Sequence, residues 1–208
     1  MGLFQNLTKV KVRKDWVFAN KYPGYYWMRL DKVGVGKLYT DGSKRDTRNR
    51  LREEFITIHM TVISVLDCTE PPPRAMVGEE LVNYIKVTGN EYAEKNFAQF
   101  LMGVFGLRDA SELDSPEIRA LLGDKDWEDW LGNEDPKYGP VQPLTGSVIE
   151  MRNRFTLPSE KQKAENPAAT GFVNLWYQRP VPAAEVQAAL PPDQLKRYFP
   201  GGFNPVTG

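Results

Sequence analysis

The sequence predicts a mainly β domain in which three strands, one helix and two more strands follow one another along the chain. Five runs rich in β-branched and aromatic residues alternate apolar and polar positions, which is the strand pattern. One stretch between the third and fourth runs has helical spacing instead. The 17 glycines and 16 prolines among 208 residues disfavour a fold dominated by long helices.

The first two strands are predicted at residues 25–38 and 55–66. In the first, one side carries Tyr26, Met28 and Leu30, and the other carries Tyr25, Trp27, Arg29 and Asp31. Gly34 and Gly36 predict a bend or bulge further along that strand. In the second strand, the apolar side carries Ile56, Ile58, Met60 and Val62, and the opposite side carries Phe55, Thr57, His59 and Thr61.

The third strand is predicted at residues 81–87, and the helix follows it. Asn90 is the expected N-cap, and Glu91 and Glu94 in the first turn favour the helix dipole. Gly106 is the expected end of the helix. Apolar residues recur at helical spacing in between: Tyr92, Ala93, Phe97, Phe100, Leu101, Val104 and Phe105.

The last two strands are predicted at residues 147–157 and 171–178, after an acidic region. In that region a short helix starts at Ser115, and Trp127, Trp130 and Leu131 are expected to dock a second one. Either side of the last strand could face the core, so the orientation of Trp176 stays open. A short helix is also predicted within the Pro/Gly-rich tail, at residues 191–199.

This order of elements predicts a five-stranded Greek-key barrel of the OB type. In that fold, a helix between strands three and four closes one end of the barrel. The expected organisation is an N-terminal arm at 1–15, an OB domain at 16–180 with an acidic helical insert at about 108–142, and a Pro/Gly-rich C-terminal extension at 181–208.

The net charge is zero, but the charges are segregated along the chain. Residues 1–60 hold 13 Lys and Arg against 6 Asp and Glu, whereas residues 105–140 hold 4 against 10. Such a distribution can present a basic surface to a polyanion and an acidic surface elsewhere. The alternative is that the charges scatter over the folded surface and cancel.

The densest positive charge lies between the first two predicted strands. Five basic residues fall within nine positions there: Lys44, Arg45, Arg48, Arg50 and Arg52. In an OB barrel the first hairpin loop borders the oligonucleotide-binding face, so this loop is a candidate grip on a phosphate backbone. The alternative is a solvated loop without a binding role.

Flat side chains for base stacking are expected on the outside of the barrel. If Met28, Ile58, Ile85 and Ile149 point inward, their neighbours Trp27, Arg29, Phe55, Tyr84, Lys86, Arg152 and Arg154 point outward. Aromatic and cationic side chains side by side are what single-strand binding without sequence preference requires. The alternative is that Trp27, Phe55 and Tyr84 are covered by the N-terminal arm, the acidic insert or a second subunit.

Six stretches carry a family resemblance: GYYWMRLDKVGVGK (24–37), FITIHMTVISV (55–65), MVGEELVNYIKV (76–87), NFAQFLMGVFGL (96–107), PLTGSVIEMRNRFT (143–156) and FVNLWYQRP (172–180). In order and pattern the chain resembles the OB-fold single-stranded-DNA-binding proteins of tailed phages, over roughly residues 16–180. The acidic tail common in that family has no counterpart in the final FNPVTG.

The resemblance implies a protein that coats single-stranded DNA during phage replication and recombination. It implies replication or recombination proteins, and further copies of the chain, as candidate partners in the host cytoplasm. The rival hypothesis is a structural or adaptor protein, a component of a virion or complex, with a β-barrel and no role in nucleic-acid binding.

The sequence offers little for catalysis, and we expect neither an enzyme nor a bound cofactor or metal. His59 is the single histidine, and Cys68 is the single cysteine, which fits a reducing cytoplasm. The acids Asp124, Asp126, Glu128 and Asp129 form a local run rather than a converging metal site, and more simply face water. The glycines at 34 and 36 lack the rest of a phosphate-loop motif, and no signal peptide or 18-residue apolar run is present.

Overall fold

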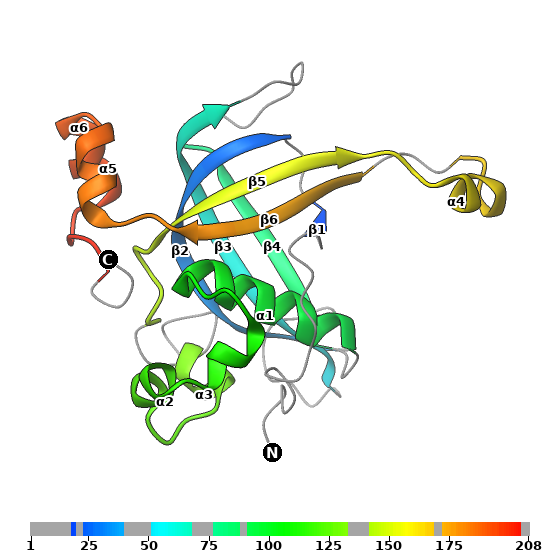
Figure 1. The fold of residues 1–208 in the computed structure, drawn as a ribbon, viewed down its shortest axis with the longest axis horizontal. Helices are drawn as coiled ribbons and strands as arrows, with labels where there is room; N and C mark the ends of the chain where they lie inside the picture. Colours follow the sequence, from blue (N-terminus) through cyan, green and yellow to red (C-terminus); the bar gives the residue numbers. More distant parts are fainter. Residues whose placement is uncertain are drawn as a thin grey trace.

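The fold is a curved antiparallel sheet that packs one face against a long helix (Figure 1). The structure is a computed structural model, and it describes residues 18–19, 23–39, 51–67, 77–87, 91–132, 142–168 and 172–204. The strands are β1 (Phe18–Ala19), β2 (Gly24–Tyr39), β3 (Leu51–Asp67), β4 (Glu80–Val87), β5 (Val148–Thr156) and β6 (Phe172–Pro180). All five predicted strands are confirmed, with boundaries shifted by a few residues.

The strand order in the sheet is β1-β6-β5-β2-β3-β4, and every ladder is antiparallel. Within the described residues no ladder joins β4 to β6, so the sheet is open. Strand β1 pairs only with Asn174 and Leu175, so among the described residues the rest of β6 is an edge of the sheet. This edge and β4 are linked, because Asn83 Nδ2 on β4 donates a hydrogen bond to the Tyr177 hydroxyl oxygen on β6 at 2.9 Å. Burial raises the pKa of Tyr177, and the hydrogen bond from Asn83 only partly offsets that effect.

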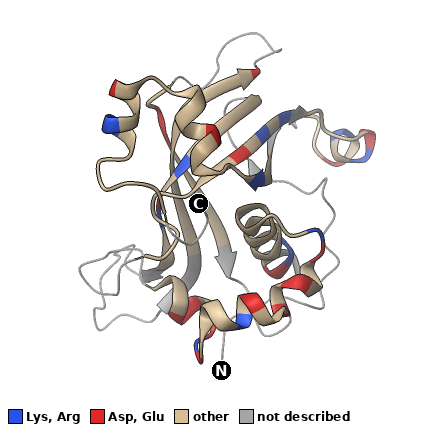
Figure 2. Cartoon of the chain, turned by 60° about the vertical axis from the view of Figure 1, so that its left-hand side comes forward, with Lys and Arg blue, Asp and Glu red and all other residues tan. Residues whose placement is uncertain are grey.

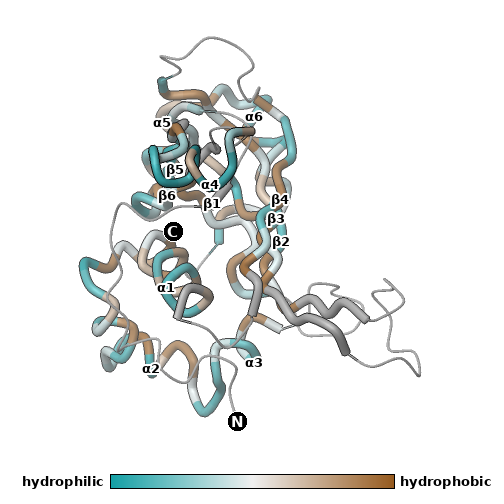
Figure 3. Tube along the Cα trace, turned by 90° about the vertical axis from the view of Figure 1, so that its right-hand side faces the viewer, coloured by the Kyte–Doolittle hydropathy of each residue, from teal (hydrophilic) through white to brown (hydrophobic). Residues whose placement is uncertain are grey.

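Helix α1 (Glu91–Phe105) fills the space between these two edges, and the sheet curls around it (Figure 3). Its apolar face buries Phe97, Phe100 and Val104 completely, as the spacing predicted. Gly106 ends the helix with a φ of 68°, a conformation that favours glycine, so the expected stop is confirmed. The expected N-cap, Asn90, lies outside the described residues.

The register of the β2–β3 ladder shifts at four places, and none of them is at Gly34 or Gly36, where the sequence suggested a bend or bulge. The ladder with β3 runs from Leu30↔Met60 to Lys32↔His59, so Asp31 is the extra residue of a β-bulge. Its carboxylate accepts hydrogen bonds from Thr61 Oγ1 and Arg29 Nε, each at 2.6 Å. The bulge shifts the alternation by one position, which puts Val33 in the core and keeps Lys32 outside it.

Beyond the bulge, β2 no longer pairs with β5, and other groups satisfy its free edge. Val33 N donates to Gln142 Oε1 at 3.1 Å, and Val35 N donates to the Gly132 carbonyl at 2.8 Å. Both acceptors belong to the acidic insert. The insert therefore protects a strand edge that would otherwise expose unpaired backbone groups.

The described part of the acidic insert contains the 3₁₀ helix η2 (Ala110–Asp114) and the short helices α2 (Pro116–Leu122) and α3 (Trp127–Leu131). Ser115 caps α2 as predicted, by accepting a hydrogen bond from Ile118 N. The expected docking of Trp127, Trp130 and Leu131 is confirmed, since all three are buried. The two indoles pack edge to face with ring centroids 5.7 Å apart, against Phe105 of α1.

The last described segments are α4 (Glu160–Glu165) between β5 and β6, and α5 (Ala183–Ala189) and α6 (Pro192–Tyr198) in the C-terminal extension. The sequence predicted α6 but not α5. These two helices cover part of the sheet face opposite to α1 (Figure 1). Their apolar residues form a second, smaller core with Trp27, Ile63 and Val148.

Helix α1 approaches the sheet closely at Gly103. A Cβ atom at this position would lie 2.4 Å from Tyr177 Cβ and 2.9 Å from the Tyr177 carbonyl oxygen. Only a residue without a side chain lets the helix sit this close to β6. The position thereby sets the distance between α1 and the β6 edge.

We predict that Gly103→Ala destabilises the protein by about 1–3 kcal/mol, because the added methyl group overpacks the contact with Tyr177. This loss outweighs the helix propensity that alanine gains over glycine, which is about 1 kcal/mol. The change in the urea unfolding midpoint measures it. Gly201→Ala is the matched control, since nothing lies within 4 Å of the added methyl group. Equal stability of Gly103→Ala and wild type would contradict the close approach.

Candidate nucleic-acid interface

The candidate interface lies on the side of the sheet turned away from α1, which we call the outer face. The ladders place its residues in rows that cross the strands. One row joins Tyr25, Arg152 and Trp176, and the next along β2 joins Ser64, Trp27, Glu150 and Arg179. Predicted site residues therefore do share a face, but they fall into different rows.

The first row is a stack of two aromatic rings with a cation between them, which we call the stacked row. Tyr25 of β2 pairs with Arg152 of β5, and Arg152 pairs with Trp176 of β6. The Arg152 guanidinium carbon lies 5.0 Å from the centroid of the Tyr25 ring and 5.4 Å from that of Trp176. Both distances are within the range of cation–π attraction. The row combines the aromatic rings and the positive charge that are expected of a surface for single-stranded DNA.

Arg152 makes no salt bridge or hydrogen bond with the described residues. The rings of Tyr25 and Trp176 hold its guanidinium in place. Its neighbour Arg154 is exposed and lies across the ladder from Asn174. Neither arginine is neutralised by a carboxylate in the part of the chain that the structure describes. Their N–H donors are available to an anion.

The other arginines of this face are already paired. Arg29 is half-buried, forms a salt bridge with Asp31 and donates to the Tyr198 carbonyl of α6. Arg179, which the sequence analysis did not single out, bridges Glu150 at 3.0 Å and Glu185 of α5 at 2.7 Å. Arg29 was a predicted binding residue, but the structure gives it a different role: it holds the C-terminal extension.

The prediction that Trp27 is exposed is wrong. Its side chain is 5% exposed and packs with Val186, Leu190 and Phe199 of the C-terminal extension. The cover seen among the described residues is the C-terminal extension, which was not one of the three covers expected from the sequence: the N-terminal arm, the acidic insert and a second subunit. Residues 1–15 of the expected arm lie outside the described residues. The extension docks there because its own apolar residues need a partner, and Trp27 provides a large apolar surface.

Asn204 fastens the far end of this extension. Its Nδ2 donates to the carbonyl oxygens of Pro143 at 2.7 Å and Thr145 at 2.6 Å. The rings of Phe199 and Phe203 stack with centroids 4.3 Å apart in the turn that leads there. The cover is therefore held by packing, by Arg29 and by Asn204 together.

Tyr84 also lies on the outer face, but away from the stacked row. It lies on β4, is 50% exposed and pairs through Thr57 with Gly34 of β2. Nine positions along β2 separate Tyr25 from Gly34, which is roughly 30 Å of strand. The rows of Trp27 and Arg29, under the C-terminal extension, lie between the stacked row and Tyr84.

Most of the predicted basic residues cannot be placed in this face. Lys44, Arg45, Arg48 and Arg50 lie outside the described residues. For three further predicted residues the strand backbone is described but the side chain is not: Arg52, Phe55 and Lys86. The predicted basic hairpin loop therefore stays a prediction. The described residues that flank this loop, Tyr39 and Leu51, lie at the end of the β2–β3 ladder that is far from Tyr25.

The sequence analysis missed Tyr25 and left Trp176 undecided. Alternation had placed Tyr25 on the correct side, but nothing in the sequence showed that it lies opposite Arg152. The orientation of Trp176 follows from its neighbours, since Leu175 and Tyr177 are both buried against α1. Only the β5–β6 register brings the three residues of the stacked row together.

Acidic residues gather on the insert, at the other end of the molecule from α5 and α6 (Figure 2). Asp124, Asp126 and Asp129 are exposed there, as expected. Among the described residues, no group of three or more His, Cys, Asp or Glu side chains is arranged to hold a metal ion. Nor is any described helix both long and apolar enough to cross a membrane.

Comparison of the chain with protein-family models, with curated proteins and with solved structures finds no match.

The ion pair between Arg179 and Glu185 makes the attachment of α5 depend on pH. The hydrogen bonds from Arg179 hold the pKa of Glu185 below its usual value of 4.5. A lowered carboxyl pKa contributes stability above the unfolded-state value, and this contribution is lost as the pH falls through the folded-state value.

We therefore predict that Glu185→Gln is less stable than wild type at neutral pH, and that the difference disappears as the pH falls below 4.5. Urea unfolding midpoints of both proteins across this range measure it. Glu117→Gln on α2, which makes no ion pair among the described residues, is the control and should match wild type throughout. A difference that persists at low pH would point to packing rather than charge.

Proposed function

We propose that this chain binds single-stranded DNA without sequence preference and has no catalytic role. The observation that carries the proposal is the stacked row, Tyr25–Arg152–Trp176, which crosses three neighbouring strands. Every base has a π face, so aromatic side chains can stack with any sequence, at about 1–3 kcal/mol per base. Arg152 and the exposed Arg154 supply positive charge for the phosphates beside those rings.

We further propose that the open sheet is a variant of the OB Greek-key barrel. Three features support this: the β6-β5-β2-β3-β4 order, the single long helix between β4 and β5, and the hydrogen bond from Asn83 to Tyr177 that links the two sheet edges. In this variant α1 occupies the gap between the edge strands. OB folds bind oligonucleotides on the face of their second and third strands, which correspond to β3 and β4 here and carry Tyr84. The stacked row lies on the neighbouring strands β2, β5 and β6 of the same outer face.

The stacked row and Tyr84, both on the outer face, suggest the path of a bound DNA strand. It would lie on the stacked row, pass the C-terminal extension and reach the rows of Tyr84. Single OB folds engage about 4–16 nucleotides, and a path of roughly 30 Å falls within that range.

The cellular setting is proposed from the family resemblance alone. A non-specific single-strand binder of this type would act in DNA replication and recombination of a phage-like genome, in the host cytoplasm. Other replication or recombination proteins and further copies of the chain are the partners that this role implies.

We predict that labelled dT oligonucleotides bind to the wild-type protein, with an affinity that falls steeply as salt rises. Fluorescence anisotropy across a salt titration measures both quantities. Arg152→Ala should lower the affinity roughly threefold to tenfold, and should reduce the slope of log K against log salt by about 0.7, the value for one lost phosphate contact on a single strand.

Arg119→Ala is the matched control for this experiment. Arg119 is an exposed arginine on α2 that pairs with Asp114, remote from the outer face. Its removal should leave the affinity and the salt slope unchanged. Absence of salt-sensitive binding by the wild-type protein at low ionic strength would refute the proposed function.

A second candidate function is that of a structural or adaptor protein, and the hairpin around α4 is the observation that favours it. All six residues of α4 are exposed, and Ser159 and Gln162 form a capping box that orders the helix without support from the sheet. The hairpin projects from the body (Figure 1). Such an arm could contact another protein.

Charge reversal in the basic loop discriminates between these two functions. If Arg45, Arg48 and Arg50 grip a phosphate backbone, changing all three to Glu should abolish oligonucleotide binding while the protein stays folded. An adaptor should instead keep its weak or absent DNA binding and lose assembly with its partner. Anisotropy with dT oligonucleotides and circular dichroism measure the two outcomes.

A further inference from the structure

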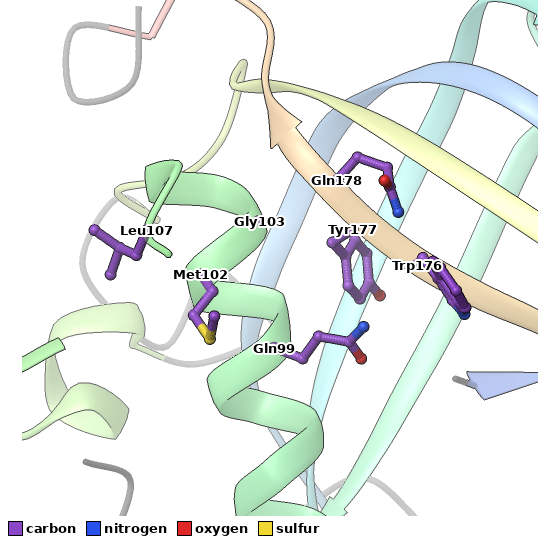
Figure 4. A pocket seen from close by; sticks show the side chains of 7 residues that line it. All are labelled: Gln99, Met102, Gly103, Leu107, Trp176, Tyr177 and Gln178. Carbon is purple, nitrogen blue, oxygen red and sulfur yellow. The ribbon is translucent and has the colours of Figure 1, made fainter. Parts of the chain in front are cut away.

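A pocket of about 170 Å³ lies between α1 and the edge of β6 (Figure 4). We call it the α1–β6 pocket. The helix contributes Gln99, Met102 and Gly103 with the adjacent Leu107, and the strand contributes Trp176, Tyr177 and Gln178. The close approach at Gly103 holds the two elements together at one point, and the pocket opens beside it.

Two polar groups of the lining residues have no hydrogen-bond partner among the residues that the structure describes. Gln99 is 4% exposed, and its carboxamide oxygen is buried without a donor. The indole N–H of Trp176 is also buried without an acceptor. Figure 4 shows the Gln99 carboxamide extending from α1 toward β6. A buried polar group without a partner costs about 1–3 kcal/mol, so a pair of them beside a pocket calls for an explanation.

The size of the pocket limits what could satisfy these groups. A cavity of about 150 Å³ in another protein holds one benzene molecule, whereas pockets for drug-sized ligands measure about 300–1,000 Å³. The α1–β6 pocket is therefore suited to a single ring. Its aromatic and thioether walls, Trp176, Tyr177 and Met102, favour a flat one.

The polarity of the lining narrows the choice further. Among the described residues no Lys, Arg, Asp or Glu lines the pocket, so this lining favours a neutral ring over a phosphate or carboxylate. A glutamine carboxamide can donate and accept at once, and this is how it pairs with a base edge. A nucleobase has a flat face, a neutral charge and adjacent donors and acceptors.

The geometry points to the α1–β6 pocket as a site for one nucleobase. Where the base belongs to a bound strand, this inference rests on the proposed function, because Trp176 is part of both the stacked row and the pocket. The backbone of the strand would then remain near Arg152 while one base turns over the edge of β6. A free nucleoside presents the same ring and is the other possible source.

The test measures whether Gln99 and the base act together. Anisotropy titrations use a dT oligonucleotide and an abasic oligonucleotide of equal length, with wild type, Gln99→Leu and Gln187→Leu. Gln187 is an exposed glutamine on α5 and provides the matched control. Calorimetric titration with thymidine supplies the free-nucleoside arm.

Gln99→Leu should lower the affinity for the dT oligonucleotide about fivefold to tenfold, the effect of one lost hydrogen bond at a buried site. It should leave the affinity for the abasic oligonucleotide unchanged, and Gln187→Leu should affect neither. The unfolding midpoint of Gln99→Leu should equal or exceed that of wild type, because a buried amide without a partner has been removed. Loss of affinity with retained stability distinguishes a ligand contact from a structural role.

The outcomes separate this inference from the proposed function. If wild type and Gln99→Leu bind the dT oligonucleotide equally and thymidine does not bind, the pocket assignment is wrong and the proposed function stands. If no oligonucleotide binds but thymidine binds wild type and not Gln99→Leu, the pocket stands with a free nucleoside as its ligand. If neither oligonucleotide nor thymidine binds, both proposals fail.

Discussion

The packing of Tyr177 against α1 is the interaction on which the rest of the structure depends. Its phenol accepts the hydrogen bond from Asn83, its ring meets Phe100 edge to face at 5.1 Å, and its backbone lies against Gly103. One side chain thus joins the helix to both edges of an open sheet. Because Tyr177 faces inward, its neighbour Trp176 must face outward, which creates the stacked row and one wall of the α1–β6 pocket.

The outer face shows how pairing decides the role of an arginine. Arg29 and Arg179 lie beside carboxylates, and both are used to attach the C-terminal extension. Arg152 lies instead between two rings, which hold the guanidinium through its face. Within the described part of the chain, the N–H donors at its edge have no acceptor. Of these three arginines on one sheet face, Arg29 and Arg179 therefore have a structural role, and Arg152 is the one proposed to contact a ligand.

The acidic insert and the C-terminal extension each complete the sheet in a different way. The insert covers the free edge of β2 through Gly132 and Gln142, and its indoles extend the aromatic core around α1. The extension covers a central part of the outer face and buries Trp27. Both segments dock through apolar residues. The insert keeps its acidic side chains at the surface, and the extension keeps the ion pair of Glu185 with Arg179 there. The zero net charge therefore hides a molecule with an acidic end and a sheet face whose Arg152 and Arg154 have no carboxylate partner among the described residues.

Much of the fold could be predicted from local patterns. Alternation located the five long strands, helical spacing and Gly106 bounded α1, and the buried tryptophans of α3 were recognised from their spacing. These features depend on neighbours in the chain, so the sequence contains them directly. The bulge at Asp31 was not predicted, because it depends on Thr61 from the adjacent strand, and the glycines nearby were the stronger local signal.

The sequence by itself determined which residues lie in strands and helices, and which of them share a side of a strand. The tertiary structure decided which side is open to solvent and which residues become neighbours across strands. Trp27 has the same local pattern as an exposed platform residue, and only the folding back of residues 181–204 buries it. Tyr25, Arg152 and Trp176 are far apart in the chain, and only the ladder registers bring them into contact. Burial and register depend on segments distant in sequence, which no local pattern records.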